Sequence, residues 1–147
     1  MDYDLHILKL AQEGFCCSQI VLHMALATEG SHNPGLIRSM AGLCNAPPAG
    51  KGTCGAFTGA CCLLAYYAGK GDEYDEMDNT VDLMIDELSM WFEGHCHKHH
   101  SGTTCIKIIG DQEAQPQICG GLINLCYAKC IELLEAHGFT FGVARDE

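Results

Sequence analysis

Hydrophobic residues recur at intervals of three and four positions over much of the chain, the spacing that places side chains on one face of an α-helix. The clearest case is residues 75–93, where acidic residues occupy the opposite face. Its apolar stripe consists of Met77, Val81, Met84, Ile85, Leu88 and Trp91 or Phe92. No stretch alternates with period two, so the pattern predicts helices and no strands.

Capping residues set the ends of the expected helices. Asn33 and Pro34 read as an N-cap followed by proline at the first helical position. Thr53 is expected to cap a helix that begins at Cys54, and Thr103 or Thr104 a short helix that begins at Cys105. The expected helices cover residues 2–13, 15–28, 34–43, 54–68, 75–93, 105–109 and 116–137.

Glycine, proline and polar residues mark the segments between these helices. Residues 45–52, 94–103 and 110–115 are expected to be loops, and residues 139–147 a short strand-like arm or a disordered tail. The chain has 147 residues, no internal repeat and no linker long enough to divide it. We therefore predict an all-α fold, a single-domain helical bundle of about five main helices over residues 1–147.

Charge and cysteine content narrow the function classes. The formal net charge of −11 argues against nucleic acid and anionic membranes as partners, and no apolar run reaches the length of a membrane span. The eleven cysteines are an odd number, and Asp2, Asp4 and His6 interrupt the N-terminus where a secretory signal would be apolar. We expect mostly reduced cysteines in a cytoplasmic protein, where such clusters indicate metal or redox chemistry.

The positions of the cysteines on the expected helices suggest which of them are reactive. Four lie in the first turn of a helix, where free N–H groups and the helix dipole lower the pKa of a thiol: Cys17, Cys54, Cys105 and Cys119. Cys61 lies two turns after Cys54 on the same face, and Cys126 and Cys130 follow Cys119 at helical spacing. Plain packing is the expectation for Cys16, Cys44 and Cys62.

Two further features each have two interpretations that the sequence leaves open. Gly55 and Gly59 lie on one helix face, so they could admit a cofactor or a closely packed neighbouring helix. The tract His95-Cys96-His97-Lys98-His99-His100 could bind a transition metal or be a solvated loop. No C-x-x-C pair is present, so the tract matches no common zinc motif.

The cysteine motifs together resemble a family of small bacterial and archaeal redox-active proteins named for their C-GCAxxG-C-C pattern. The matching motifs are Cys17 in GFCCSQ, the segment CGAFTG that begins at Cys54, and Cys105 in TTCIKIIG. The fourth cysteine would be Cys126 or Cys130. The segment reads Cys-Gly-Ala where the family name is written Gly-Cys-Ala, and this chain has seven cysteines beyond the four. The resemblance spans about residues 14–137 and implies redox activity without a settled substrate.

We therefore expect clustered thiols that either exchange with disulfides or hold a metal ion or iron–sulfur centre. The expected catalytic residues are Cys17, Cys54, Cys105 and Cys126, with Cys54 as the attacking thiol and Gly55 and Gly59 beside a cofactor. The expected metal ligands are Cys17, Cys54, Cys61, Cys105, Cys119, Cys126 and Cys130. The alternatives are a copper or zinc storage or delivery protein and an accessory subunit of a larger redox enzyme. The expected partner is a redox protein of unknown identity, with a homodimer as a weaker expectation.

Overall fold

The computed structural model describes residues 3–76, 78–110 and 116–143 and confirms the all-α prediction. Within these residues, five longer helices and three short ones follow one another. They are α1 (Asp4–Gln12), α2 (Cys17–Glu29), α3 (Pro34–Met40), the 3₁₀ helix η1 (Ala41–Leu43), α4 (Gly55–Ala68), α5 (Thr80–His99), α6 (Cys105–Ile109) and α7 (Pro116–Ala136). No helix in the described part of the chain is both long enough and apolar enough to cross a membrane.

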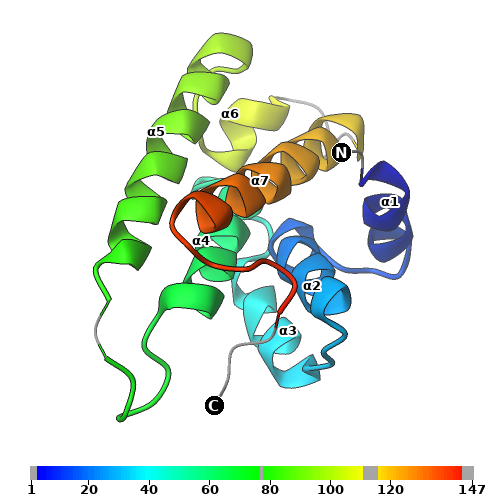
Figure 1. The fold of residues 1–147 in the computed structure, drawn as a ribbon. Helices are drawn as coiled ribbons and strands as arrows, with labels where there is room; N and C mark the ends of the chain where they lie inside the picture. The colour runs from blue at the N-terminus through cyan, green and yellow to red at the C-terminus, as the bar shows by residue number, and fades with distance from the viewer. Residues whose placement is uncertain (1–2, 77, 111–115, 144–147) are drawn as a thin grey trace.

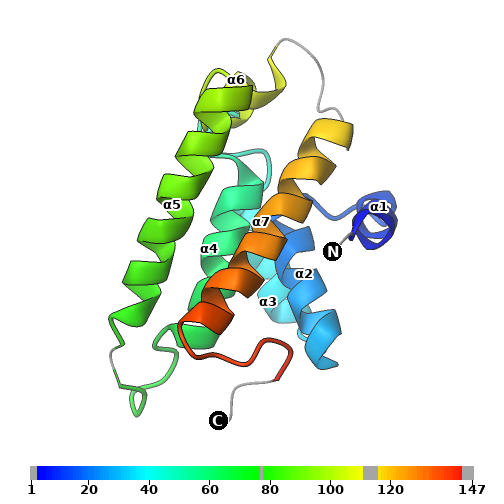
Figure 2. The same ribbon diagram turned by 45° about the horizontal axis from the view of Figure 1, so that its top comes forward.

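Helices α4 and α7 occupy the middle of the molecule (Figures 1 and 2). Helix α5 packs against them on one side and α2 on the other, while α1 lies beyond α2 and touches α7. Large side chains that are almost fully buried fill the core between these helices, among them Leu22, Leu63, Phe92, Tyr127 and Leu134.

The tightest contact in this arrangement joins α4 to the first turn of α2. A Cβ atom placed on Gly59 would lie 2.8 Å from both Cα and the carbonyl oxygen of Ser18. Ser18 is fully buried, and its hydroxyl donates a hydrogen bond to the carbonyl of Met40 at 3.0 Å. Because backbone meets backbone here, the start of α2 has a fixed position on α4.

A second tie joins the segment before α4 to the segment before α6. Thr53 and Thr104 form an isolated antiparallel bridge. The backbone N–H of Cys54 donates to the carbonyl of Thr103 at 3.0 Å, and that of Cys105 donates to Gly52 at 3.1 Å. These bonds bring Cys54 and Cys105 together although they are distant in the sequence.

The expected N-cap at Asn33 is confirmed, because its side chain accepts a hydrogen bond from the N–H of Leu36 at 3.1 Å. The expected N-cap at Thr53 is wrong. Thr53 belongs to the bridge described above, and the N-cap residue is Cys54, whose carbonyl accepts the N–H groups of Phe57 and Thr58. Helix α4 therefore begins one residue later than expected.

Helix α5 differs from its expected range of 75–93 at both ends. It begins at Thr80, whose N–H donates a hydrogen bond to the carboxylate of Asp78. Residue 75 belongs instead to a turn, in which the Asp75 carboxylate accepts hydrogen bonds from the N–H groups of Gly71 and Asp72. It continues to His99, because Cys96 extends the buried line of Leu88 and Phe92 at intervals of four residues. The expected loop at 94–103 is thus largely helical. Met77 lies outside the described residues.

The tail was expected to be a strand-like arm or disordered, and for residues 139–143 this is wrong. These residues fold back on the bundle, with Phe139 and Phe141 packed against the core. The N–H of Gly142 donates to the hydroxyl of Tyr67 at 3.0 Å. Residues 144–147 lie outside the described part of the chain.

The contact at Gly59 predicts a specific loss of stability. Gly59→Ala should lower the free energy of unfolding by about 2 kcal/mol, because its methyl group would displace the backbone of Ser18. Gly94→Ala is the matched control in α5, where a Cβ meets nothing within 4 Å, and it should raise the stability by up to about 1 kcal/mol. Urea unfolding followed by circular dichroism measures both. Equal stabilities of the two variants would contradict the fixed contact.

Candidate functional site

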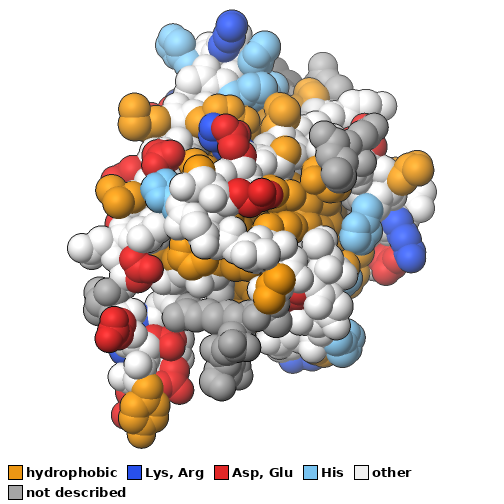
Figure 3. All heavy atoms as spheres, viewed as in Figure 1, with side chains coloured by type: hydrophobic (Ala, Val, Ile, Leu, Met, Phe, Trp, Pro, Cys, Tyr) orange, Lys and Arg blue, Asp and Glu red, His pale blue; other side chains and the backbone are white. Residues whose placement is uncertain are grey.

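The candidate site is a cavity of about 640 Å³ at the end of the bundle where α2, α4, α6 and α7 begin. Helix α1 forms one of its walls. In the space-filling view, hydrophobic side chains are exposed in a hollow of the surface between α7 and α1 (Figure 3). Six cysteines line this cavity: Cys16, Cys17, Cys44, Cys54, Cys105 and Cys119.

Four of these cysteines are free thiols, and a different element positions each one. Cys17 is the first residue of α2, Cys54 is the N-cap of α4, Cys105 is the first residue of α6, and Cys119 lies in the first turn of α7. Each of the four interacts electrostatically with the other three. Four segments that are distant in the sequence thus place their thiols in one group.

The remaining two lining cysteines form a disulfide. Cys16 and Cys44 are bonded, with their Cα atoms 5.7 Å apart, which is within the ordinary range for a disulfide. The expectation that both are reduced packing residues is therefore wrong. Each lies at an extended position beside a helix end, Cys16 as the N-cap of α2 and Cys44 directly after η1. The two cysteines are 28 residues apart, and no motif in the sequence indicates that they pair.

The thiols of Cys17 and Cys119 lie close enough for the S–H of one to act as a hydrogen-bond donor to the other, and each has the largest influence on the pKa of its partner. This interaction lowers the pKa of Cys119 to about 7, against the opposing effect of burial, because the S–H of Cys17 stabilises the Cys119 thiolate. The same interaction, followed by desolvation, raises the pKa of Cys17 far above its usual value. The pair therefore holds one proton firmly on Cys17 and carries its negative charge on Cys119.

The expected lowering of the pKa is wrong at Cys17, as described above, and also at Cys54 and Cys105. Burial raises the pKa of Cys54 to about 11, although the N–H groups of Ala56 and Phe57 act in the opposite direction. Burial also raises the pKa of Cys105, and a negative charge on Cys119 raises it further. Loss of water outweighs the favourable field of a helix start at both positions.

The other cysteines of the expected catalytic and metal-binding sets lie elsewhere. Cys126 and Cys130 are fully buried in the core, and the Cys130 thiol donates to the carbonyl of Ala60 at 3.5 Å. Burial raises the pKa of both thiols and also that of Cys61 to about 12. None of these three lines the cavity. The position that completes the group is Cys119, and its place in the first turn after Pro116 was the available sequence signal.

For Gly55 and Gly59, the structure shows close helix packing. A Cβ on Gly55 would lie 3.3 Å from Cβ of Cys17, and Ser18 fills the space beside Gly59. Gly55 also lines the cavity, so it is the one of the two that can adjoin a ligand. Within residues 3–76, 78–110 and 116–143, no group of three or more Cys, His, Asp or Glu side chains has the arrangement of a metal site.

The histidine-rich tract forms the last turn of α5 and the residue after it. The ring centroid of His95 lies 5.9 Å from the ring centroid of Trp91 and 4.6 Å from that of His99. Burial lowers the pKa of His95, and the neighbouring charges of His99 and His100 lower it further. Cys96 is buried in the core, so the tract is not one Cys/His ligand group, and metal binding by its histidines stays a prediction.

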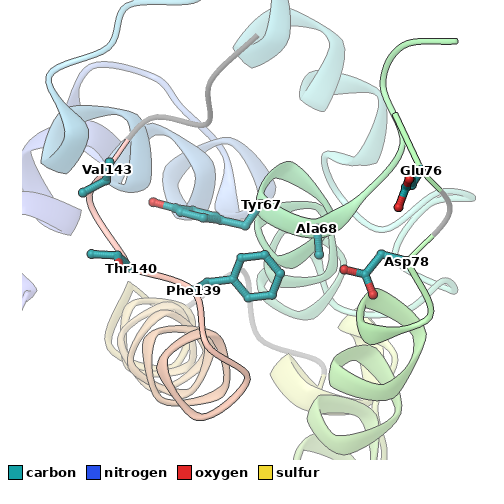
Figure 4. A pocket seen from close by; sticks show the side chains of 7 residues that line it. All are labelled: Tyr67, Ala68, Glu76, Asp78, Phe139, Thr140 and Val143. Atoms are coloured by element: carbon teal, nitrogen blue, oxygen red, sulfur yellow. The ribbon is translucent and has the colours of Figure 1, made fainter. Parts of the chain in front are cut away.

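A second cavity of about 530 Å³ lies at the other end of α4. Its described lining contains no thiol; it combines Tyr67, Ala68, Phe139, Thr140 and Val143 with the carboxylates of Glu76 and Asp78. Figure 4 shows Asp78 pointing toward Ala68 and Phe139, with the hydroxyl of Tyr67 on the far side. Only the first cavity therefore brings reactive side chains together.

One comparison identifies relatives of this chain. A family model described as "Putative redox-active protein (C_GCAxxG_C_C)" matches residues 15–133, which is most of the chain and includes all four cavity thiols. The match confirms the resemblance drawn from the cysteine pattern. No curated protein and no solved structure matches the chain.

The hydrogen bond between the two thiols predicts how the reactivity of Cys119 depends on pH. Alkylation of Cys119 by iodoacetamide should rise with pH to a plateau with a midpoint near 7, because only the thiolate reacts. In Cys17→Ala the midpoint should move above the ordinary value for a thiol, since only the effect of burial remains. Mass spectrometry of the Cys119 peptide after short labelling pulses measures the rate.

Cys17→Ser is the matched variant, because its hydroxyl can still donate to the Cys119 thiolate. Its midpoint should lie between those of the wild type and Cys17→Ala. A midpoint that is the same in all three proteins would show that Cys17 does not stabilise the thiolate.

Proposed function

Because the chain belongs to the C_GCAxxG_C_C family of redox-active proteins, we propose that it exchanges its Cys17–Cys119 dithiol with disulfides. The observation that carries this proposal is the position of these two thiols beside each other in the lining of one cavity. It supplies an attacking thiolate and a resolving thiol already in contact. The proposal assigns the attack to Cys119 in place of Cys54, whose pKa is raised by burial.

The exchange begins at Cys119. Its thiolate attacks one sulfur of a disulfide R–S–S–R, so a Cys119–S–S–R bond forms and the first RS⁻ leaves and takes a proton from water. Cys17 then gives up its proton and attacks the sulfur of Cys119, which forms the Cys17–Cys119 disulfide. The second RS⁻ leaves and takes that proton. The two cysteines lose two electrons, and R–S–S–R is reduced to two R–SH molecules.

The first step itself prepares Cys17 for the second. The largest cause of the raised pKa of Cys17 is its hydrogen bond to Cys119, and the charge of Cys119 adds to it. Once Cys119 carries the R–S group, both causes are gone and only burial and the two other thiols remain. The pKa of Cys17 therefore falls when its deprotonation is needed.

Cys54 and Cys105 lie beside this pair and complete the group of four thiols. In the described structure the four thiols do not have the arrangement of a metal site, so a soft metal ion or an iron–sulfur centre would require their sulfur atoms to move closer together. Metal storage and an accessory role in a larger redox enzyme are the alternatives to exchange. A redox partner protein, a cytoplasmic location and a homodimer stay predictions.

Mild oxidation tests the dithiol directly. Protein that keeps the Cys16–Cys44 disulfide and has Cys17 and Cys119 as thiols should lose two thiols reversibly when it is treated with diamide, and mass spectrometry of its peptides should find them joined as Cys17–Cys119. Cys119→Ser should lose this bond and slow the reaction at least about tenfold, because its remaining cavity thiols have raised pKa values.

Cys62→Ser is the matched control, since Cys62 is a partly buried free thiol that does not line the cavity. It should oxidise like the wild type. If the mapped disulfide joined other cysteines, the assignment of the dithiol would be wrong. Stoichiometric iron, copper or zinc in protein purified without oxygen, lost in Cys119→Ser, would instead support a metal centre at the same four thiols.

A further inference from the structure

We infer that the cavity selects a small, uncharged, apolar disulfide as the substrate of this dithiol. The inference rests on the proposed exchange activity and goes beyond it, because exchange alone would accept any accessible disulfide. What carries it is the lining of the cavity, its volume and the exposure of one wall.

The lining is mainly apolar. Side chains of α1, η1, α6 and α7 surround the thiols, among them Ile7, Leu8, Leu43, Ile108, Leu122 and Ile123. Asp4 is the one described lining residue with a formally charged side chain besides the ionisable thiols, and its carboxylate accepts a hydrogen bond from Asn124 at 3.0 Å. Such a surface favours alkyl groups and offers no cation to an anionic ligand.

The volume of the cavity suits a small ligand, and its charge disfavours anionic disulfides. A cavity of about 640 Å³ falls within the range of sites that enclose a small molecule. The chain has a net charge of −11, and the charged lining residue, Asp4, is acidic. A disulfide with carboxylate ends would therefore exchange its hydration for at most the amide groups of Asn45 and Gln117, with no cation in the described lining, and would be repelled as it approached.

The wall formed by α1 offers a position at which selectivity can be changed without touching the core. Leu8 lines the cavity but is 50% exposed, so a longer polar side chain can be placed there. Leu5 lies on the same helix, is 84% exposed and does not line the cavity. The same substitution at both positions changes the net charge equally but changes the cavity only at Leu8.

The test compares two disulfides of similar length that differ in charge. Reduced protein is mixed with dipropyl disulfide or with 3,3′-dithiodipropionate, and thiol release is followed over time. Each rate is divided by that of dithiothreitol with the same disulfide, which removes the difference in intrinsic reactivity. The normalised rate should be at least about tenfold higher for dipropyl disulfide, because a carboxylate resists transfer into an apolar site.

Leu8→Lys should lower this preference at least about threefold, since it places a cation in the wall and removes an apolar side chain. Leu5→Lys should leave the preference as it is in the wild type. Equal normalised rates for the two disulfides, or the same change in both lysine variants, would overturn the inference.

A binding measurement separates this inference from the exchange reaction. Dipropyl ether is an unreactive shape analogue, and its addition to Cys119→Ser should shift the amide NMR signals of cavity residues such as Ile108 and Ile123 but not those of Leu5. If these shifts occur but the diamide experiment finds no Cys17–Cys119 bond, the exchange function fails and the apolar site stands. If the bond forms but the ether shifts nothing in the cavity, the apolar selectivity fails and the exchange function stands.

Discussion

The close approach of α4 to the first turn of α2 is the constraint on which the candidate site depends. Gly59 leaves room for the backbone of Ser18, and a side chain there would push α2 away. Cys17 precedes Ser18 and Cys54 lies five residues before Gly59, so this one contact fixes the distance between two of the four thiols. The bridge between Thr53 and Thr104 then adds Cys105, and packing of α7 against α4 adds Cys119. The cluster is therefore a consequence of backbone contacts and helix packing rather than of bonds between the sulfur atoms.

Burial and pairing act in opposite directions on the thiols held in this way. Desolvation raises the pKa of Cys54 and Cys105, and the helix starts on which they lie do not compensate for it. Cys119 differs because the Cys17 S–H group donates to it. In an apolar cavity one donated hydrogen bond therefore distinguishes a nucleophile from its neighbours, and the same low polarity strengthens that bond.

The sequence predicted what depends on local interactions and missed what depends on contacts between distant segments. The helices and the cap at Asn33 follow from spacing and capping chemistry, which act over a few residues. The sequence predicts that the helix ends at residue 93, because Gly94 and the histidines after it are typical of a loop, whereas the burial of Cys96, which extends α5 to His99, depends on packing against distant segments. Cys17, Cys54 and Cys105 were recognised by their motifs. The Cys16–Cys44 disulfide and the cap at Cys54 depend on contacts that only the folded chain reveals.

The choice of the fourth thiol shows why sharing a helix face does not determine chemistry. Cys119 and Cys126 are seven residues apart on α7 and so project from nearly the same side. Seven residues also advance the helix by roughly 10 Å along its axis. That advance carries the chain from the cavity, where Cys119 has the Cys17 thiol as its partner, into the core, where Cys126 is fully buried. Burial keeps Cys126 protonated, so it acts as a small apolar side chain. Position along the helix, not the face, therefore determines which cysteine of α7 is available for reaction.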